Sequence, residues 1–286
     1  KDGLLGFSSY YSFQARYAKL RPLTREGFRQ AMIPYDYQNL AELFNKVKPF
    51  SYRKIKEECL DLPPKIHTRR ELSMSTQQLE IYNQLKKYAR AVLLDKKTSY
   101  TNKLTEILRL HQVTCGFFKS DTGEIQELNN PKLKELVNIL EEMDGKVIIW
   151  ANYIYNIEQI IKTLKDKFPY DRTVSVYGAV SVADRDKAVE NFQKDPYTKF
   201  LVGNPATGGY GLNLTEADTV IYYSNSYDLT VREQSEDRAH RKGQTKSVTY
   251  IDLVMTGTID EFILKALNDK KRMSAQVLGE EVLNFL

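Results

Sequence analysis

The sequence predicts an α/β protein: a parallel, doubly wound sheet flanked by helices and preceded by a mostly helical segment. From Pro131 onwards, short apolar runs typical of strands alternate with helical patterns about five times. Parallel strands require crossover connections, and helices of this kind provide them. Residues 1–128 have a different texture, because helical spacing dominates there and aromatic and basic residues are interleaved.

The composition is that of an ordinary globular protein. The 286 residues are 42% hydrophobic and 28% charged, with a net charge of +5. This mild excess of basic residues permits nucleic-acid contact without arguing for it. Cys59 and Cys115 are far apart, so they predict neither a zinc site nor a disulfide framework. No apolar run approaches the roughly 20 residues of a membrane span. Because Lys1 is not an initiator methionine, we expect a longer parent chain.

The predicted elements follow in chain order. The Leu62-Pro63-Pro64-Lys65 step predicts an extended crossing, since each proline fixes φ and restricts the residue before it. Apolar spacing then predicts helices over Ser75–Leu94 and about 102–112. Strands are predicted at Lys146–Ala151, Thr173–Tyr177, Lys199–Val202, Thr219–Tyr223 and Val248–Val254. Helices are predicted at Pro131–Met143, about 153–166, about 182–194 behind a Ser181 cap, up to Lys242 before Gly243, and from Thr258.

Three residues with helical spacing are candidates for phosphate chemistry. Gln234, Arg238 and Arg241 are spaced i, i+4 and i+7, so one helix would place them on one face. Guanidinium groups are planar, always charged and able to bind two oxygens at once, which suits a phosphoryl group. We expect the three side chains to project into a groove at the working edge of the sheet. The alternative is a solvated helix face with a local ion pair, such as Glu236–His240 or Asp237–Arg241.

A glycine-rich loop, Asn204–Leu214, follows the strand predicted at Lys199–Val202. Its glycines leave backbone N–H groups uncovered, so the loop can approach phosphate or sugar closely. It matches neither GxxxxGK[ST] nor GxGxxG, and the alternative is a tight turn with close helix–sheet packing. In doubly wound sheets the working loops lie beyond the carboxyl ends of the strands.

Taken in order, these segments resemble the second RecA-like lobe of the Swi/Snf-type ATPases of helicase superfamily 2. GGYGLNLTEADTVIYY resembles the family's motif V region, QSEDRAHRKGQ its motif VI and KVIIWANYIYNIEQIIKTL its motif IV. VYGAVSVADRDKAVENF resembles the Y-x-G-x-x-S-x-x-x-R block that follows motif IV. LPPKIHTRRELSMSTQQLEIYNQL resembles the passage that joins the lobes, and GTIDEFILKALNDKKRMSAQVLG the helix and brace that close the second lobe. Two departures are Ala206, where a basic residue is usual, and Tyr227-Asp228-Leu229, where Trp-Asn-Pro is common.

The resemblance implies three regions and a role for each matching residue. Residues 1–62 would be a helical tail and protrusion from the first lobe, 63–128 the interlobe linker and helical lead-in, and 129–286 the second lobe. Arg238 and Arg241 would be arginine fingers reaching the γ-phosphate of ATP, with Gln234 orienting groups in the same cleft. The nucleotide edge would comprise Gly209, Gly211 and Asn213. The DNA backbone would be contacted by Tyr177, Gly178, Ser181, Thr207 and Gly208.

The resemblance also implies what another lobe supplies. The family's first lobe carries a Walker A lysine and an Asp-Glu-x-His magnesium site, whereas the only Gly-Lys and Asp-Glu pairs here are Gly145-Lys146 and Asp260-Glu261. We therefore expect ATP to be shared with the first lobe of the same parent chain, Mg²⁺ to be bound by that lobe, and no metal on this chain. Double-stranded DNA is the expected partner, with no membrane. A cytoplasmic, bacterial or virus-encoded protein is favoured, with a nuclear location left open.

Two other classes stay open on the residues alone. A non-catalytic nucleic-acid-binding module derived from a motor lobe would share this sequence, and GK[ST] and DEx[HQ] motifs upstream would tell the two apart. A nucleotide-sugar or other Rossmann-like enzyme predicts a ligand pocket at the switch point of the sheet, with carboxylates placed for acid–base work. The sequence contains no convincing pair of such carboxylates.

Overall fold

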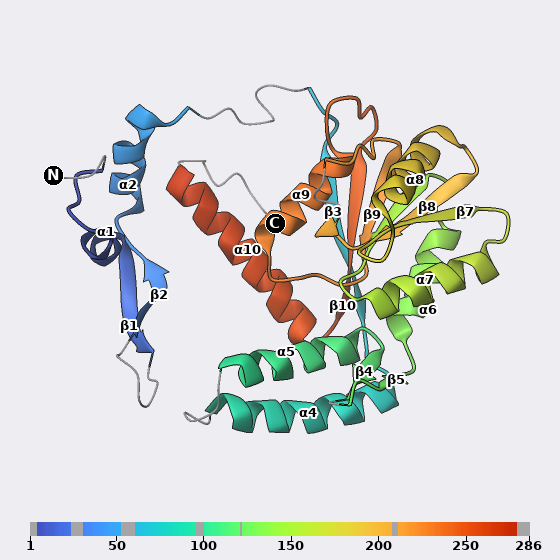
Figure 1. The fold of residues 1–286 in the computed structure, drawn as a ribbon, viewed down its shortest axis with the longest axis horizontal. Coiled ribbons are helices and arrows are strands. Elements are labelled where there is room, and N and C mark those ends of the chain that lie inside the picture. Colours follow the sequence, from blue (N-terminus) through green and yellow to red (C-terminus); the bar gives the residue numbers. More distant parts are fainter. Residues whose placement is uncertain are drawn as a thin grey trace.

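The main sheet has six strands, is parallel throughout and lies on the right in Figure 1. The computed structural model describes residues 5–23, 31–52, 61–94, 100–120, 122–207 and 211–278. The predicted α/β architecture is confirmed. In spatial order the strands are β3 (Lys65–Leu72), β10 (Val248–Met255), β9 (Ala217–Tyr222), β6 (Lys146–Trp150), β8 (Thr198–Gly203) and β7 (Arg172–Val176).

Helices cover both faces of this sheet. Within β6, Val147 and Ile149 belong to the core on one face, and Ile148 and Trp150 to the core on the other, all fully buried. A parallel strand covered on both faces carries a continuous apolar run, which is why KVIIW predicts a strand. The first face is covered by α6 (Pro131–Glu141) and α7 (Ile154–Lys167), and the second by α8 (Val182–Lys194) and α9 (Leu229–Ala239).

A helical pair precedes α6, as the spacing of apolar residues predicts. It consists of α4 (Thr76–Leu94) and α5 (Tyr100–Thr114), which share a core containing Tyr82 and Val113. Ile259, the first residue of α10 (Ile259–Leu278), packs against that core, and its backbone N–H donates to the Tyr82 hydroxyl at 2.9 Å. The short hairpin of β4 (Phe117–Lys119) and β5 (Ile125–Glu127) connects α5 to α6.

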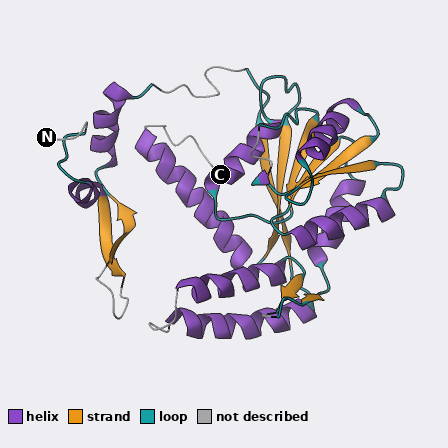
Figure 2. Cartoon of the chain, viewed as in Figure 1, coloured by secondary structure: helices purple, strands orange, loops and turns teal. Residues whose placement is uncertain are grey.

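The N-terminal part contains strands that the helical texture did not predict. Besides α1 (Tyr10–Tyr17), α2 (Leu40–Val47) and the 3-10 turn η1 (Lys48–Phe50), it holds the hairpin of β1 (Ala18–Leu23) and β2 (Ala31–Tyr37), which Figure 2 shows apart from the main sheet. α2 lies beside α10.

The Pro63-Pro64 step leads directly into β3, which pairs with β10 over its whole length. Residues assigned to a linker are thus part of the main sheet. The division at residues 62 and 128 stays a prediction.

One helix ends earlier than predicted. α9 stops at Ala239 and not at Lys242, because His240 adopts φ −94° and ψ 82°. The His240 ring donates a hydrogen bond from Nε2 to the Pro63 carbonyl at 2.7 Å, a tertiary contact that local spacing cannot reveal. Gly243, predicted to stop the helix, instead supplies φ +104° in the turn that follows.

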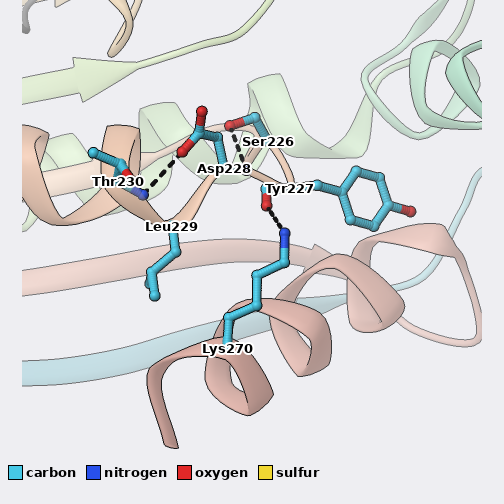
Figure 3. Close-up of a pocket in the computed structure, with 6 residues that line it drawn as sticks. All are labelled: Ser226, Tyr227, Asp228, Leu229, Thr230 and Lys270. Carbon is cyan, nitrogen blue, oxygen red and sulfur yellow. Dashed lines mark hydrogen bonds between the residues drawn. The ribbon is translucent and has the colours of Figure 1, made fainter. Parts of the chain in front are cut away.

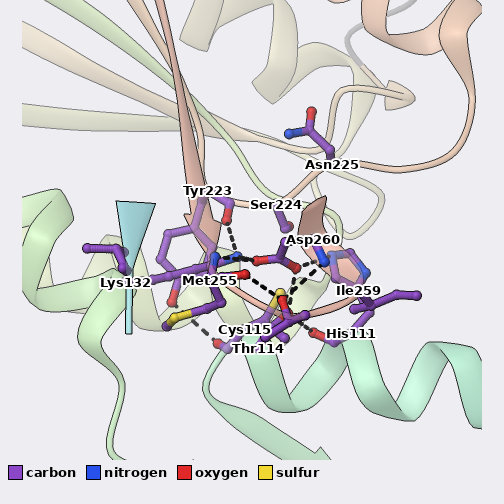
Figure 4. Close-up of polar contacts among 12 residues, drawn as sticks. His111, Thr114, Cys115, Lys132, Tyr223, Ser224, Asn225, Met255, Ile259 and Asp260 are labelled. Carbon is purple, nitrogen blue, oxygen red and sulfur yellow. Dashed lines mark hydrogen bonds and ion pairs between the residues drawn. The ribbon is translucent and has the colours of Figure 1, made fainter. Parts of the chain in front are cut away.

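A buried ion pair joins α6 to α10 beneath the end of the sheet (Figure 4). Lys132 Nζ lies 2.6 Å from Asp260 Oδ2, and the Lys132 side chain is fully buried. Thr114 Oγ1 donates to Asp260 Oδ1 at 2.8 Å, and the Met255 N–H donates to Oδ2 at 3.1 Å. The Lys132 charge and these donors hold the pKa of Asp260 below its usual value despite burial, so the carboxyl group is charged.

His111 completes this cluster from α5. Its Nε2 lies 3.8 Å from Asp260 Oδ1, and its Nδ1 lies 2.9 Å from the Tyr153 hydroxyl. Burial lowers the pKa of His111 to about 4, so the ring is neutral at pH 7. Residues of α5, α6, α10 and β10 therefore meet in one buried polar cluster. Disrupting this cluster is costly, because it would leave a charge unpaired in the apolar core.

Removing one partner of the Lys132–Asp260 pair should destabilise the fold by about 3–5 kcal/mol, because it leaves the other charge buried and uncompensated. We expect this loss of unfolding free energy for Lys132→Met and for Asp260→Asn in urea denaturation. The double variant should lose less than the sum, since the two charges are removed together. Lys194→Met is the matched control: it breaks an exposed pair with Glu190 and should cost well under about 1 kcal/mol. Equal losses for Lys132→Met and Lys194→Met would contradict a structural role for the buried pair.

Acidification should also destabilise the fold through His111. Its folded pKa, about 4, lies below the unfolded value of about 6.5, so the unfolded chain binds the extra proton in between. Stability is therefore complete above pH 6.5 and should fall as the pH drops towards 4, by at most about 1.4 kcal/mol per pH unit. Urea denaturation of His111→Phe between pH 5 and 6.5 should give a flatter slope than the unaltered chain. The remaining slope includes His67, whose pKa burial also lowers. Identical slopes would show that His111 does not titrate in this way.

Candidate nucleotide and DNA interface

A sheet of parallel strands has two chemically different edges. We call the edge where the strands begin the amino edge, and the edge where they end the carboxyl edge. Helix α9 starts after the carboxyl end of β9 and returns across the face of the sheet, because β10 must begin at the amino edge again. The two ends of α9 therefore lie near opposite edges.

The end of α9 carries what we call the arginine turn, residues Glu236–Arg241. The Leu214 N–H donates to the Arg238 carbonyl at 3.0 Å, and Arg241 Nη1 donates to the Leu212 carbonyl at 3.3 Å. Leu214 lies just before the start of β9, so these contacts place the turn at the amino edge. We expected the arginines at the working edge of the sheet, beyond the carboxyl ends of the strands. That expectation was wrong. The expectation that one helix carries both was also wrong, since Arg241 follows the end of α9.

The structure nonetheless brings the predicted phosphate-binding residues together. Gln234 is exposed on α9, one turn before Arg238, and both arginine side chains are partly exposed. Burial and then the nearby positive charge of Arg241 lower the pKa of Arg238. Two neighbouring guanidinium groups repel each other, and an anion between them would relieve that repulsion. The turn therefore has the charge and the donors that an oligophosphate requires.

The glycine-rich loop connects the two edges. At its start, Asn204 Nδ2 donates to the Asn152 carbonyl at 3.0 Å, beyond the carboxyl end of β6, and the Thr207 N–H donates to the Asn204 carbonyl. At its end, Leu212 and Leu214 bind the arginine turn. The loop thus begins at the carboxyl edge and ends in contact with the arginine turn.

Within this loop Gly211 and Asn213, two of the predicted nucleotide residues, lie beside the arginine turn. Gly211 has φ +72°, a conformation that favours glycine. Asn213 is exposed between the two leucines that bind the turn. Gly208 and Gly209 fall outside the described residues.

The predicted DNA-contacting residues lie at the carboxyl edge. Tyr177, Gly178 and Ser181 follow β7, and Gly178 and Ser181 are exposed. Ser181 caps α8 as predicted: its Oγ accepts from the Asp184 N–H at 3.2 Å and donates to the Asp184 carboxylate at 2.7 Å. Arg185 Nη2 donates to the Gly178 carbonyl at 3.2 Å, which holds the loop above the helix.

A buried charge network on α9 was missed at the sequence level. Arg232 donates to Glu236 Oε1 at 2.9 Å and forms an ion pair with Asp252 at 2.6 Å, while its guanidinium lies 3.4 Å from the Tyr222 ring centre. Lys65 Nζ lies 3.1 Å from Glu236 Oε2. These cations lower the pKa of the buried Glu236 to about 2. The Arg232–Glu236 spacing of i, i+4 was a visible signal, whereas the partner considered for Glu236, His240, binds Pro63 instead.

An open pocket of about 570 Å³ lies at the opposite end of α9 (Figure 3). Its polar groups are engaged with one another: Lys270 donates to the Tyr227 carbonyl at 2.6 Å, and Asp228 accepts from the Thr230 N–H at 2.9 Å. Because it lies beyond β9 at the carboxyl edge, it is separate from the arginine turn.

The two pairs that superficially match nucleotide motifs have structural roles. Lys146 Nζ donates to the carbonyls of Phe192 and Asp195, the latter at 2.8 Å, and Asp260 forms the buried pair with Lys132. Within the described part of the chain, no group of three His, Cys, Asp or Glu side chains is placed to hold a metal ion. In the same residues, no helix is long and apolar enough to cross a membrane.

Comparison with known sequences finds helicases. Residues 131–243 match the model of the helicase conserved C-terminal domain. YwqA of Bacillus subtilis (strain 168), whose assignment as an ATP-dependent helicase/translocase is itself provisional, is 30% identical over 262 residues, covering 86% of this chain and 28% of the relative. The chromatin-remodeling ATPase INO80 of Neurospora crassa is 32% identical over 163 residues, 56% of this chain and 8% of the relative. The chain thus spans about a quarter, or less, of the length of these relatives.

Comparison with solved structures finds the same group. The Sulfolobus solfataricus SWI2/SNF2 ATPase core in complex with dsDNA has a TM-score of 0.60 and 26% identity, covering 97% of this chain and 58% of that one. The C-terminal part of the Fun30 ATPase domain has a TM-score of 0.61 and, at 18% identity, supports the fold alone. With the six-stranded sheet and the order of its motifs, these likenesses show that the chain belongs to the Swi/Snf-type ATPases of helicase superfamily 2, as their C-terminal RecA-like lobe.

Proposed function

We propose that this chain is the C-terminal motor lobe of an ATP-dependent DNA translocase, which completes an ATP site held mainly by a first lobe of the same parent chain. One observation carries the proposal: two mutually repelling arginines lie at the amino edge and are bound to a loop that begins at the carboxyl edge. Arg238 and Arg241 act as arginine fingers on the γ-phosphate, and Gln234 orients groups beside them.

The first lobe would bind Mg·ATP, and the nucleotide supplies the phosphoryl group that water attacks. This chain contributes positive charge where negative charge develops on that group. Gly211 and Asn213 line the same side of the cleft, next to the arginine turn. Since Arg238 and Arg241 are held by backbone contacts to Leu214 and Leu212, their placement depends on the glycine-rich loop.

The carboxyl edge is the proposed DNA face. Tyr177, Gly178, Ser181 and Thr207 lie there, and the archaeal relative was solved with double-stranded DNA bound. The N-terminal end of α8 favours a phosphate over a base edge. A loop that touches both faces would carry changes at the nucleotide to the DNA, in a closure of the two lobes. The bacterial or viral origin and cytoplasmic location remain predictions.

Loss of one arginine should abolish most ATP turnover. This chain alone should hydrolyse ATP negligibly, and joining it to the first lobe should restore DNA-stimulated hydrolysis. In that two-lobed enzyme, Arg238→Ala and Arg241→Ala should each lower kcat by about 10³-fold or more, because arginine fingers stabilise the transition state. KM for ATP should change far less, since the first lobe binds the nucleotide. Steady-state hydrolysis assays measure both quantities.

Arg172→Ala is the matched control, because it removes an exposed arginine that pairs with Asp195 away from the turn. Its kcat should match that of the unaltered enzyme. Turnover by this chain alone that survives the loss of both Arg238 and Arg241 would overturn the proposal.

A negative charge at Ser181 should weaken DNA binding. Aspartate and asparagine both cap helices as well as serine does, so both variants keep a cap on α8. Only the aspartate also lies beside the Asp184 carboxylate, so the helix content of both variants is compared by circular dichroism. Only the aspartate would repel a backbone phosphate. We expect Ser181→Asp to raise the Kd for duplex DNA about tenfold relative to Ser181→Asn in fluorescence anisotropy, with the ratio shrinking at high salt. Equal affinity for the two variants at low salt would place the DNA elsewhere.

A further inference from the structure

The chain enters the main sheet at the amino edge through residues 61–72, which we call the crossing segment. Its first part contains Pro63 and Pro64, and its second part is the edge strand β3. Each proline fixes φ and restricts the residue before it, so this approach to the sheet is stiff. A stiff segment transmits a displacement better than a flexible loop does.

The crossing segment binds the arginine turn through a backbone carbonyl. His240 Nε2 donates to the Pro63 carbonyl at 2.7 Å, and His240 is only 6% exposed. A carbonyl oxygen can only accept, so Nε2 must carry the proton. His240 lies between Arg238 and Arg241, and the contact therefore holds the chain immediately after α9 ends at Ala239.

A second contact joins the same two segments through charge. Lys65 Nζ lies 3.1 Å from Glu236 Oε2 and 3.5 Å from Asp237 Oδ1. The Tyr250 hydroxyl donates to the Glu236 carbonyl at 2.9 Å, and the His67 ring of β3 stacks on the Tyr250 ring at 5.0 Å. The contacts to the arginine turn itself fall on residues within two positions of Arg238.

The contacts between the crossing segment and the arginine turn can be removed by substitution without leaving a buried charge unpaired. Glu236 also accepts a hydrogen bond from Arg232, which pairs with Asp252. Replacement of Lys65 by a neutral residue therefore leaves Glu236 paired and α9 anchored. Similarly, glutamine at position 240 keeps an N–H donor near Nε2, whereas leucine keeps the bulk and removes the donor.

We propose that His240 and Lys65 are positioning residues that latch the arginine turn to the crossing segment, so that movement of the upstream chain sets the placement of Arg238 and Arg241. The inference rests on the proposed function, in which those arginines act on ATP and the crossing segment leads from the first lobe. In this proposal neither His240 nor Lys65 contacts the nucleotide. Their effect passes through the backbone of the turn.

The test uses the complete two-lobed enzyme and compares His240→Leu with His240→Gln, and Lys65→Gln with Lys65→Arg. Misplacement of a catalytic group by about 1 Å can cost up to about 100-fold in rate. We expect His240→Leu and Lys65→Gln to lower kcat for DNA-stimulated hydrolysis by about tenfold or more, with KM for ATP and Kd for duplex DNA changed less than about twofold. The conservative variants should recover kcat to within about threefold. Lys194→Gln, which removes an exposed lysine of α8, is the control.

A second comparison separates the latch from the arginine fingers. In an Arg238→Lys background, His240→Leu should cause little further loss of kcat, because a positioning residue acts only through the group it positions. If the arginine variants are impaired but His240→Leu keeps normal kcat, or loses kcat, DNA affinity and thermal stability in parallel, the latch is wrong and the proposed function stands. If Arg238→Ala and Arg241→Ala keep normal kcat, the proposed function fails and the latch with it.

Discussion

The parallel direction of every strand in the main sheet is the constraint on which the rest of this structure depends. It sends each connection from the carboxyl edge back to the amino edge, so a helix following a strand must end at the opposite side of the molecule. α9 obeys this rule and delivers Arg238 to the amino edge. The glycine-rich loop obeys it as well, since β8 and β9 both pair with β6 in the same direction. Two distant candidate surfaces are thereby joined by one short piece of chain.

Charge is buried where these connections must be held in place. Lys132 and Asp260 join α6 to α10, and Arg232 links α9 to Asp252 on β10 and to Glu236. Buried ion pairs are weak evidence for net stability, because desolvation offsets much of their attraction. These pairs restrict geometry more than they add stability, because each carboxylate accepts hydrogen bonds from donors on different helices or strands. Such pairs select one arrangement of helices over alternatives with similar apolar burial.

Much of the fold could be predicted from sequence because its strands are buried on both faces. KVIIW and TVIYY are apolar runs without alternation, which is typical of such strands. Helix caps such as Ser181 mark where the connecting helices begin. The end of α9 could not be predicted, because it coincides with a hydrogen bond from His240 to the carbonyl of Pro63, which is far away in sequence. β3 was missed because KIHTRREL is polar: an edge strand with mostly exposed side chains has no apolar pattern to detect. The order of the motifs identified the candidate site residues. The edge of the sheet on which each residue lies could be assigned only from the strand topology of the structure.

The ion pair beneath the sheet also limits how this lobe can be dissected. The stretch from Pro131 to Gly243 contains the family's motifs, yet it excludes β3, β10 and α10. Lys132 would then lose the carboxylate of Asp260, and β9 would lose β10, one of its two neighbours in the sheet. A fragment cut at motif boundaries would expose a sheet edge and strand an ammonium group in apolar surroundings. The autonomous folding unit is therefore larger than the conserved unit, and expression boundaries are better drawn outside the crossing segment and α10.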